Sequence, residues 1–210
     1  MGADIKAALH AIARHADRRF GPRPRSAWPN LLVMTDRAVQ GDAWHLADAL
    51  PSGSIICLRD YDLKGREAYA ARLATACRHN SVRLMVAGDV SLALNVGAWG
   101  VHFPEGLWKH AIRGVARARA HNLRVSTAVH RRQAARCVVV GGRAMCDMAL
   151  VSPVFATQSH PGAPALGPIG LAGILAELPV PAYALGGVAP QTVGRLAGLP
   201  LCGVAGIRFT

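Results

Sequence analysis

Short apolar runs alternate along the chain with longer stretches that place apolar residues at helical spacing. Eight of the runs predict β-strands, at residues 31–36, 54–60, 83–88, 100–103, 123–130, 148–155, 181–187 and 202–207. Four of the intervening stretches predict helices, at residues 65–80, 107–122, 131–142 and 167–178. Because most of the strands are apolar throughout, both faces of the sheet are expected to be buried, as in a parallel sheet covered by helices.

Eight strand units within 210 residues favour an α/β fold of the single (β/α)8 TIM barrel type over an open, doubly wound sheet. An amphipathic segment at residues 4–20 precedes the first strand and predicts an extra N-terminal helix. The chain ends a few residues after the eighth strand, so no eighth helix is expected at the C-terminus. The predicted organisation is a helix and connector at residues 1–30 and one barrel domain at residues 31–210.

The charge and apolar composition exclude several classes of function. The 24 Lys and Arg residues outnumber the 12 Asp and Glu residues, giving a formal net charge of +12. Because these cations are spread along the chain, we expect them to attract small anionic substrates rather than nucleic acid. No apolar stretch approaches the length of about 18 residues typical of a membrane span, and the N-terminus lacks the apolar core of a secretory signal. A cytoplasmic protein with no membrane partner is therefore expected.

Two glycines, Gly186 and Gly187, directly follow the seventh predicted strand in the run YALGGVAP. In (β/α)8 barrels phosphate is often bound by the loops after strands seven and eight. Glycine lets backbone N–H groups approach an anion, and Pro190 fits the first turn of a helix whose N-terminus attracts negative charge. Together with Gly206 and Ile207 after the eighth strand, these glycines are predicted to bind phosphate, although a plain turn remains the alternative.

Polar side chains follow most of the other predicted strands and are expected to face the same end of the barrel. Arg59 follows strand two, and its planar cation suits phosphate or carboxylate. His130 ends strand five, and histidine suits proton transfer because its unperturbed pKa is close to neutral. The remaining candidates are Thr35 and Asp36 after strand one, His102 on strand four, Ser126 on strand five, and Thr157, Ser159 and His160 after strand six. Each of these groups alone is also compatible with a structural role.

The order of five segments is similar to that of the thiamine phosphate synthase/TenI superfamily: VMTDR, CLRDYDLKGRE, SLALNVGAWGVHF, SPVFATQSHPG with a following LG, and ALGGV. The resemblance runs from about residue 31 to residue 208 and implies a small phosphorylated substrate of thiamine biosynthesis. In this superfamily the synthase joins a hydroxymethylpyrimidine pyrophosphate to a thiazole phosphate with Mg²⁺, releasing pyrophosphate. The TenI branch binds the same thiazole phosphate, and some members catalyse its tautomerisation to the aromatic form.

The synthase motifs are only partly present in this chain. Arg59 matches the arginine of a Q-L-R-x-K pattern, whereas Cys57 and Tyr61 stand in place of its glutamine and lysine. Gly88 replaces the metal-binding aspartate of an N-D-R pattern, and His160 replaces the lysine of a T-x-T-K pattern. In the H-x-G-Q-x-D pattern that begins at His102, the second metal aspartate has no match.

These replacements affect the expected chemistry. Ionising a pyrophosphate leaving group requires several negative charges to be neutralised, usually by a metal ion and by cationic side chains. Asp89 and Glu105 are the candidates to bind Mg²⁺ in place of the lost aspartates, and Mg²⁺ is expected only if the synthase reaction is retained.

The resemblance therefore favours the TenI branch, in which a histidine at the position of His130 moves a proton. Arg59, Ser126, Thr157, Ser159 and His160 would then line the rest of the substrate site. A diverged synthase and a non-catalytic protein that binds a phosphorylated ligand for regulation are the alternatives. Self-association into a homo-oligomer is left open.

Overall fold

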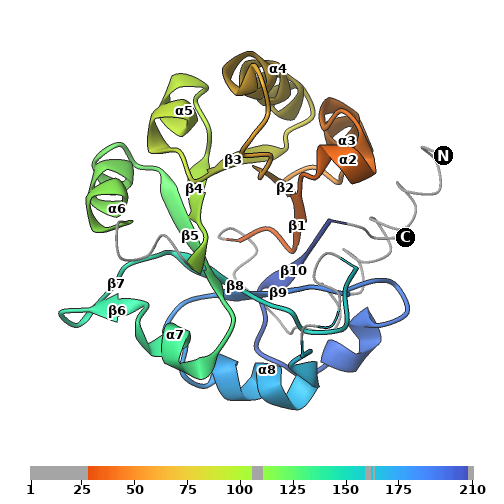
Figure 1. Cartoon of the computed structure of the whole chain (residues 1–210), viewed down its shortest axis with the longest axis vertical. Helices are drawn as coiled ribbons and strands as arrows, with labels where there is room; N and C mark the ends of the chain where they lie inside the picture. Colours follow the sequence, from red (N-terminus) through yellow and green to blue (C-terminus); the bar gives the residue numbers. More distant parts are fainter. Residues whose placement is uncertain (1–27, 106–110, 159–161, 163, 208–210) are drawn as a thin grey trace.

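The computed structural model describes residues 28–105, 111–158, 162 and 164–207. The predicted N-terminal helix and residues 208–210 after the last strand lie outside this described part. Within it, eight parallel strands form a closed barrel with helices around the outside (Figure 1). The predicted TIM barrel is thus confirmed. Among the described helices, none is both long and apolar enough to cross a membrane.

The barrel strands are short, and each lies within a run that the sequence predicts. They are β1 (Leu31–Met34), β2 (Ile55–Leu58), β3 (Arg83–Ala87), β4 (Gly100–Phe103), β5 (Arg124–Val129), β8 (Met148–Val151), β9 (Ala182–Leu185) and β10 (Gly203–Gly206). Their order around the barrel is β1-β10-β9-β8-β5-β4-β3-β2. The first strand pairs with both β2 and β10, and this second pairing closes the barrel.

Three of the predicted helices form close to their expected positions. They are α4 (Arg66–His79), α6 (Ala111–Ala120) and α8 (Gly167–Leu175). The beginning of the predicted helix at 107–122 falls in residues 106–110, outside the described part. The sequence analysis does not single out the shorter helices α2 (Arg37–Gln40), α3 (Trp44–Ala49) and α5 (Val90–Asn95), nor the 3₁₀ helix η2 (Val193–Leu196).

The predicted helix at residues 131–142 is wrong in its second half. The helix α7 spans only Arg132–Arg136, and β6 (Val139–Val140) then pairs antiparallel with β7 (Arg143–Ala144). Gly141 and Gly142 have φ angles of +58° and +77°, as a two-residue hairpin turn with two left-handed positions requires. The glycine pair in the segment VVGGRA is therefore a sequence signal for this hairpin. Figure 1 shows this hairpin at the edge of the molecule beside α7.

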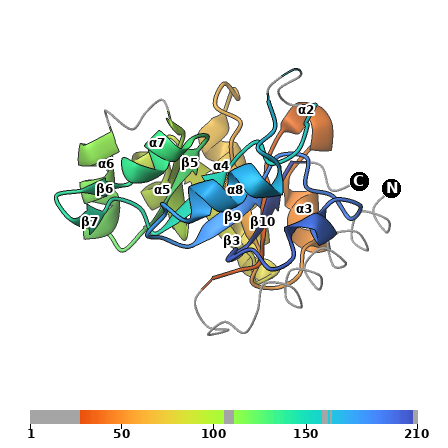
Figure 2. The same cartoon turned by 90° about the horizontal axis from the view of Figure 1, so that it is seen from below.

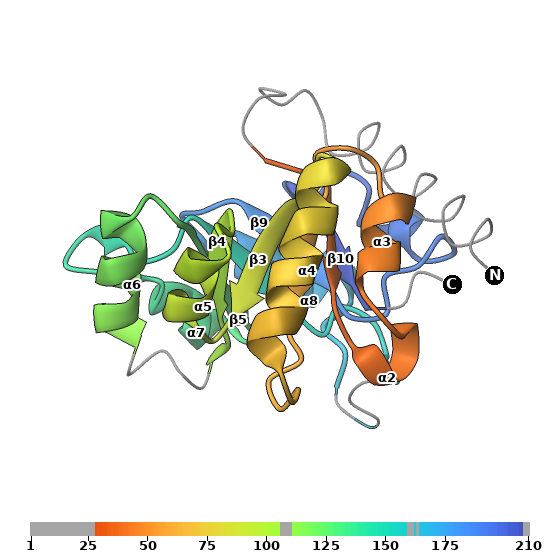
Figure 3. The same cartoon turned by 90° about the horizontal axis from the view of Figure 1, so that it is seen from above.

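Alternate strand residues face the barrel interior or the surrounding helices, so the core has two layers. Large apolar side chains fill the interior: Leu32, Met34, Ile55, Met85, Met148, Leu150 and Tyr183. The carboxyl ends of the strands lie at the end of the barrel where α2 is found, which is the top of Figure 2 and the bottom of Figure 3. A site built from residues that follow the strands lies at this mouth.

Candidate functional site

His130 lies at the mouth, directly after β5, and both of its ring nitrogens have partners. Its Nδ1 lies 2.8 Å from the carbonyl oxygen of Ser152 and 3.1 Å from the hydroxyl oxygen of the same residue. Because a carbonyl oxygen can only accept, Nδ1 carries the proton, and the lone pair of the neutral ring is on Nε2. The carboxylate of Glu105 lies 3.5 Å from Nε2 and forms an ion pair with the ring only when Nε2 is protonated. The imidazole is thus fixed in orientation, while its side chain is 47% exposed to solvent.

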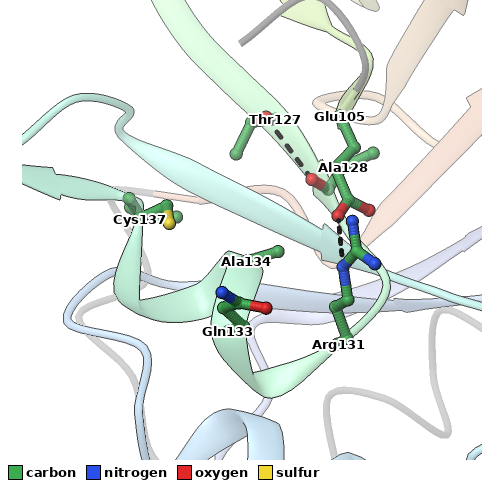
Figure 4. Close-up of a pocket in the computed structure, with 8 residues that line it drawn as sticks. Glu105, Thr127, Ala128, Arg131, Gln133, Ala134 and Cys137 are labelled. Atoms are coloured by element: carbon green, nitrogen blue, oxygen red, sulfur yellow. Dashed lines mark hydrogen bonds and ion pairs between the residues drawn. The ribbon is translucent and has the colours of Figure 1, made fainter. Parts of the chain in front are cut away.

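Glu105 joins His130 to a cavity on the outer side of the barrel. Its Oε2 contacts His130, and its Oε1 lies 3.2 Å from Nε of Arg131. Figure 4 shows this ion pair at the edge of a cavity of about 340 Å³, which Thr127 and Cys137 also line. Thr127 neighbours an inward-facing residue on β5 and therefore faces outward, so the cavity lies beside α7 rather than inside the barrel.

Arg59, predicted to bind an anion of the substrate, forms an ion pair within the mouth. Its Nη2 lies 3.0 Å from Oδ2 of Asp36, and both side chains are largely buried. Its backbone N–H donates to the hydroxyl of Thr35, which in turn donates to the carboxylate of Asp60. The guanidinium is therefore held in place by β1, and Asp36 already neutralises part of its charge.

His102 and Ser126 lie below the mouth, inside the barrel. They are paired in the register of β4 and β5, and Nδ1 of His102 lies 2.8 Å from Oγ of Ser126. His102 is 3% exposed and Ser126 is fully buried. Ser126 is predicted to bind substrate, and in this structure its hydroxyl contacts Nδ1 of His102. Burial, together with the nearby positive charges of His130 and Arg59, lowers the pKa of His102 to about 4.

The two glycines after β9 are required by close packing as well as by conformation. Gly186 and Gly187 have φ angles of +91° and +63°. A Cβ at Gly187 would lie 2.4 Å from the carbonyl oxygen of Ala156, and one at Gly186 would lie 2.9 Å from Cα of Pro153. The loop after β8 thus approaches this backbone directly, so the glycine pair has a structural reason that does not involve a ligand.

The same turn also presents backbone donors at the mouth. No described residue accepts a hydrogen bond from the N–H of Gly187 or Val188. The hydroxyl of Thr192 fastens the turn by accepting from the N–H of Ala189 and donating to the carbonyl of Gly187. The helix expected to begin at Pro190 does not form: Thr192 closes a turn there, and only the four-residue η2 follows.

The remaining predicted substrate-binding residues follow β8 or lie at the end of β10, and two of them fall outside the described residues. Gly206 ends β10, and the register of this strand with β9 brings Gly206 and Ile207 beside Gly186 and Gly187. Thr157 is half-buried in the loop after β8. Ser159 and His160 lie outside the described residues.

Both carboxylates proposed for Mg²⁺ have contacts within the protein in this arrangement. Asp89 caps α5, with its Oδ1 accepting from the N–H of Leu92 at 2.8 Å. Glu105 is engaged by His130 and Arg131. Mg²⁺ in phosphate chemistry is held by one or two carboxylates together with the substrate phosphates, and a metal ion here would compete with the contacts of these two. In the described part of the chain, no group of three or more His, Cys, Asp or Glu side chains is placed to hold a metal ion.

Two contacts of His130 are not predicted from the sequence. Glu105 is predicted only as a metal candidate, whereas the structure places it beside Nε2 of His130. The carbonyl of Ser152, which fixes the tautomer of His130, is not predicted at all. The sequence contains a signal for the contact between Glu105 and His130, because residues that follow the neighbouring strands β4 and β5 meet at the mouth.

Comparison with known proteins finds sequence relatives over most of the chain. Residues 31–209 match the model of the thiamine monophosphate synthase family, TMP-TENI. The chain is 30% identical over 186 residues to the putative thiamine-phosphate synthase 2 of Aquifex aeolicus (strain VF5), covering 86% of this chain and 97% of that protein. It is 30% identical over 178 residues to the thiamine-phosphate synthase of Laribacter hongkongensis (strain HLHK9), covering 83% and 77% of the two chains.

Solved structures share the fold. A thiamine phosphate pyrophosphorylase from Pyrococcus furiosus superposes with a TM-score of 0.66 at 20% identity, covering 84% of each chain. A mutant tryptophan synthase α-subunit from Pyrococcus furiosus has a TM-score of 0.62 at 14% identity, covering 85% of this chain and 87% of that one. Barrels of different activity are thus similar at this level, and the family is decided by the sequence matches. Since those matches extend over most of its length, the chain belongs to the thiamine monophosphate synthase (TMP-TENI) family of thiamine biosynthesis.

Proposed function

We propose that this protein binds a thiazole phosphate and catalyses its tautomerisation, with His130 as the group that moves the proton. The observation that carries the proposal is the fixed orientation of His130 at the mouth, with Nδ1–H bound to the carbonyl of Ser152 and Nε2 directed to Glu105. A positioned imidazole of this kind is a standard general acid and base.

The proton transfer follows from the tautomer. Nε2 takes a proton from a ring carbon, and the electron pair left behind moves into the conjugated system of the ring. The imidazolium that forms has the carboxylate of Glu105 beside its new N–H bond and the carbonyl of Ser152 beside the other. Return of the proton to the other end of the conjugated system gives the aromatic isomer, so no atom or electron is gained or lost.

The phosphate would be bound at the turn after β9, two strands away from His130 around the mouth. The N–H groups of Gly187 and Val188 are the donors that support this placement, since isolated backbone donors at a glycine turn attract anions. The positive charge of the chain would raise the local concentration of such a substrate. His130 and this turn follow β5 and β9, which flank β8 in the barrel, so a small molecule can contact both.

The synthase reaction is the second candidate, and the names of both curated relatives favour it. Against it, Asp89 and Glu105 are occupied by contacts within the protein. The ring of Tyr61 also lies over Gly88, with its Cε1 only 3.1 Å from where a Cβ would stand. An aspartate at this position would need this half-exposed ring to move, and it would also be strained at the φ of +74° that Gly88 adopts. These contacts favour the isomerisation over the Mg²⁺-dependent synthase reaction.

Two assays with the full chain separate these functions. In the first, conversion of the non-aromatic thiazole phosphate to its aromatic isomer is followed by NMR, and His130→Gln is expected to reduce the rate by at least about 100-fold. His121→Gln, at an exposed position on the surface, is the matched control and should retain the full rate. Unchanged turnover in His130→Gln would exclude the proposed role.

In the second assay, thiazole phosphate is incubated with hydroxymethylpyrimidine pyrophosphate and Mg²⁺. Formation of thiamine phosphate faster than the isomerisation would assign the chain to the synthase reaction instead. Tight binding of thiazole phosphate without turnover in either assay would favour the non-catalytic, ligand-binding alternative.

A further inference from the structure

A polar pair lies inside the barrel where the interior is otherwise apolar. His102 alternates along β4 with Val101 and Phe103, which belong to the outer core layer, so its ring faces inward. Barrel interiors are normally filled by bulky apolar side chains. The imidazole of His102 is 97% buried in the barrel interior, and its polar ring there calls for a role other than filling space.

The hydroxyl of Ser126 determines which nitrogen of His102 carries the proton. This hydroxyl has one hydrogen and two neighbouring acceptors, Nδ1 of His102 at 2.8 Å and the sulfur of Met85 at 4.0 Å. Thioether sulfur is a weak acceptor and lies farther away, so the hydroxyl donates to Nδ1. A neutral ring that accepts at Nδ1 carries its proton on Nε2.

The Nε2–H group of His102 has no acceptor among the described residues. Buried donors without a partner are rare, and each costs about 1–3 kcal/mol when it is left unsatisfied. His102 is the last inward-facing residue of β4, because Phe103 at the end of this strand faces the outer core layer. Its ring therefore lies in the part of the barrel interior nearest the mouth.

We propose that Nε2–H of His102 donates a hydrogen bond to the reacting ring of the substrate, and that Ser126 is the positioning residue that keeps the proton on this nitrogen. The inference rests on the proposed function and adds a second histidine to it. The acceptor would be an electronegative atom of the heteroaromatic ring. While His130 removes a proton, a neutral and preorganised donor at that atom stabilises the negative charge that develops in the ring.

The tautomer is tested first, in the free protein. Ring nitrogens of ¹⁵N-histidine-labelled protein are expected to show His102 as a neutral ring with the proton on Nε2 at pH 7. Ser126→Ala should change the tautomer balance, whereas Met85→Leu, which removes the weaker acceptor, should leave it unaltered. A ring protonated on Nδ1 or on both nitrogens in the wild type would overturn the inference.

Addition of thiazole phosphate tests the contact itself. We expect the Nε2 and Hε2 signals of His102 to shift on binding. His102→Phe should lower the rate of isomerisation by about 100-fold, the usual loss on removing one preorganised donor, whereas His102→Gln, which keeps an N–H donor, should recover part of the rate. Affinity for inorganic phosphate should stay the same in both variants, because the donors of the glycine turn are untouched.

The outcomes distinguish this inference from the function on which it rests. If thiazole phosphate binds and shifts the signals of His130 but not those of His102, the contact is refuted while the proposed function stands. If wild-type protein does not bind thiazole phosphate at all, both are refuted.

Discussion

Acid is expected to destabilise this protein through one buried side chain, His102. Burial and the positive charges of His130 and Arg59 lower its pKa in the folded state from 6.5 to about 4. Between these two values the unfolded chain binds a proton at this position that the folded chain does not bind. Folding stability therefore falls as the pH falls from about 6.5, and the loss is complete below about 4.

The expected size of this effect follows from the two pKa values. At pH 5 nearly all unfolded rings are protonated and few folded ones are, which costs about 2 kcal/mol relative to pH 7. The loss approaches about 3 kcal/mol below pH 4. Because His102 is 3% exposed, solvent screens this cost little.

Urea unfolding at pH 7 and pH 5 measures the effect. The free energy of unfolding of wild-type protein should fall by about 2 kcal/mol more between the two pH values than that of His102→Gln. With a urea dependence of about 2 kcal/mol per molar, this is a relative shift in midpoint of about 1 M. Comparing the change with pH within each variant removes the general effect of the substitution on stability.

His121→Gln, which replaces an exposed histidine, serves as the control and should show the full wild-type loss. If His102→Gln loses as much stability between pH 7 and pH 5 as the wild type, the assignment of a neutral buried ring is wrong. The donor role proposed for its Nε2–H then loses its basis as well.

Gly187→Ala is expected to cost about 2–5 kcal/mol of unfolding free energy and to weaken inorganic phosphate binding, since its Cβ would overlap the loop after β8. Gly198→Ala, at a similar φ of +80° with open space around it, should cost only about 1–2 kcal/mol, and equal losses in urea unfolding would refute the steric argument. Glu105→Gln should slow the isomerisation by about 10-fold, or about 1.4 kcal/mol, by removing the carboxylate beside the imidazolium of His130; an unchanged rate in the NMR assay would contradict this. Arg66→Ala should lower stability by about 2–4 kcal/mol, because its guanidinium donates to carbonyl groups at the ends of β2 and β3, and a smaller loss than in Glu67→Ala on the same helix would argue against it.

The sequence determined the barrel because strand and helix are coded locally. A parallel strand buried on both faces needs an apolar side chain at nearly every position, and eight such runs separated by helical stretches leave few other closed arrangements. The glycine pair Gly141 and Gly142 signals a hairpin turn, so the helix predicted over residues 131–142 is wrong in its second half, while the predicted barrel is unaffected. The family followed from the order of the motifs, and the matches over residues 31–209 confirm it.

The partners of the site residues were decided only by the tertiary structure. Ser126 was grouped with the substrate-binding residues, yet the register of β4 against β5 places it beside His102 inside the barrel. Arg59 meets Asp36, and Glu105 meets His130, across strands that are distant in the sequence. Residue type and position along a strand place a group at the mouth. The register and pleat of the strands then decide which charge or hydrogen-bonding group lies next to that side chain, and so where its proton lies. They do so because they set distances of a few ångströms between segments that are far apart in the chain.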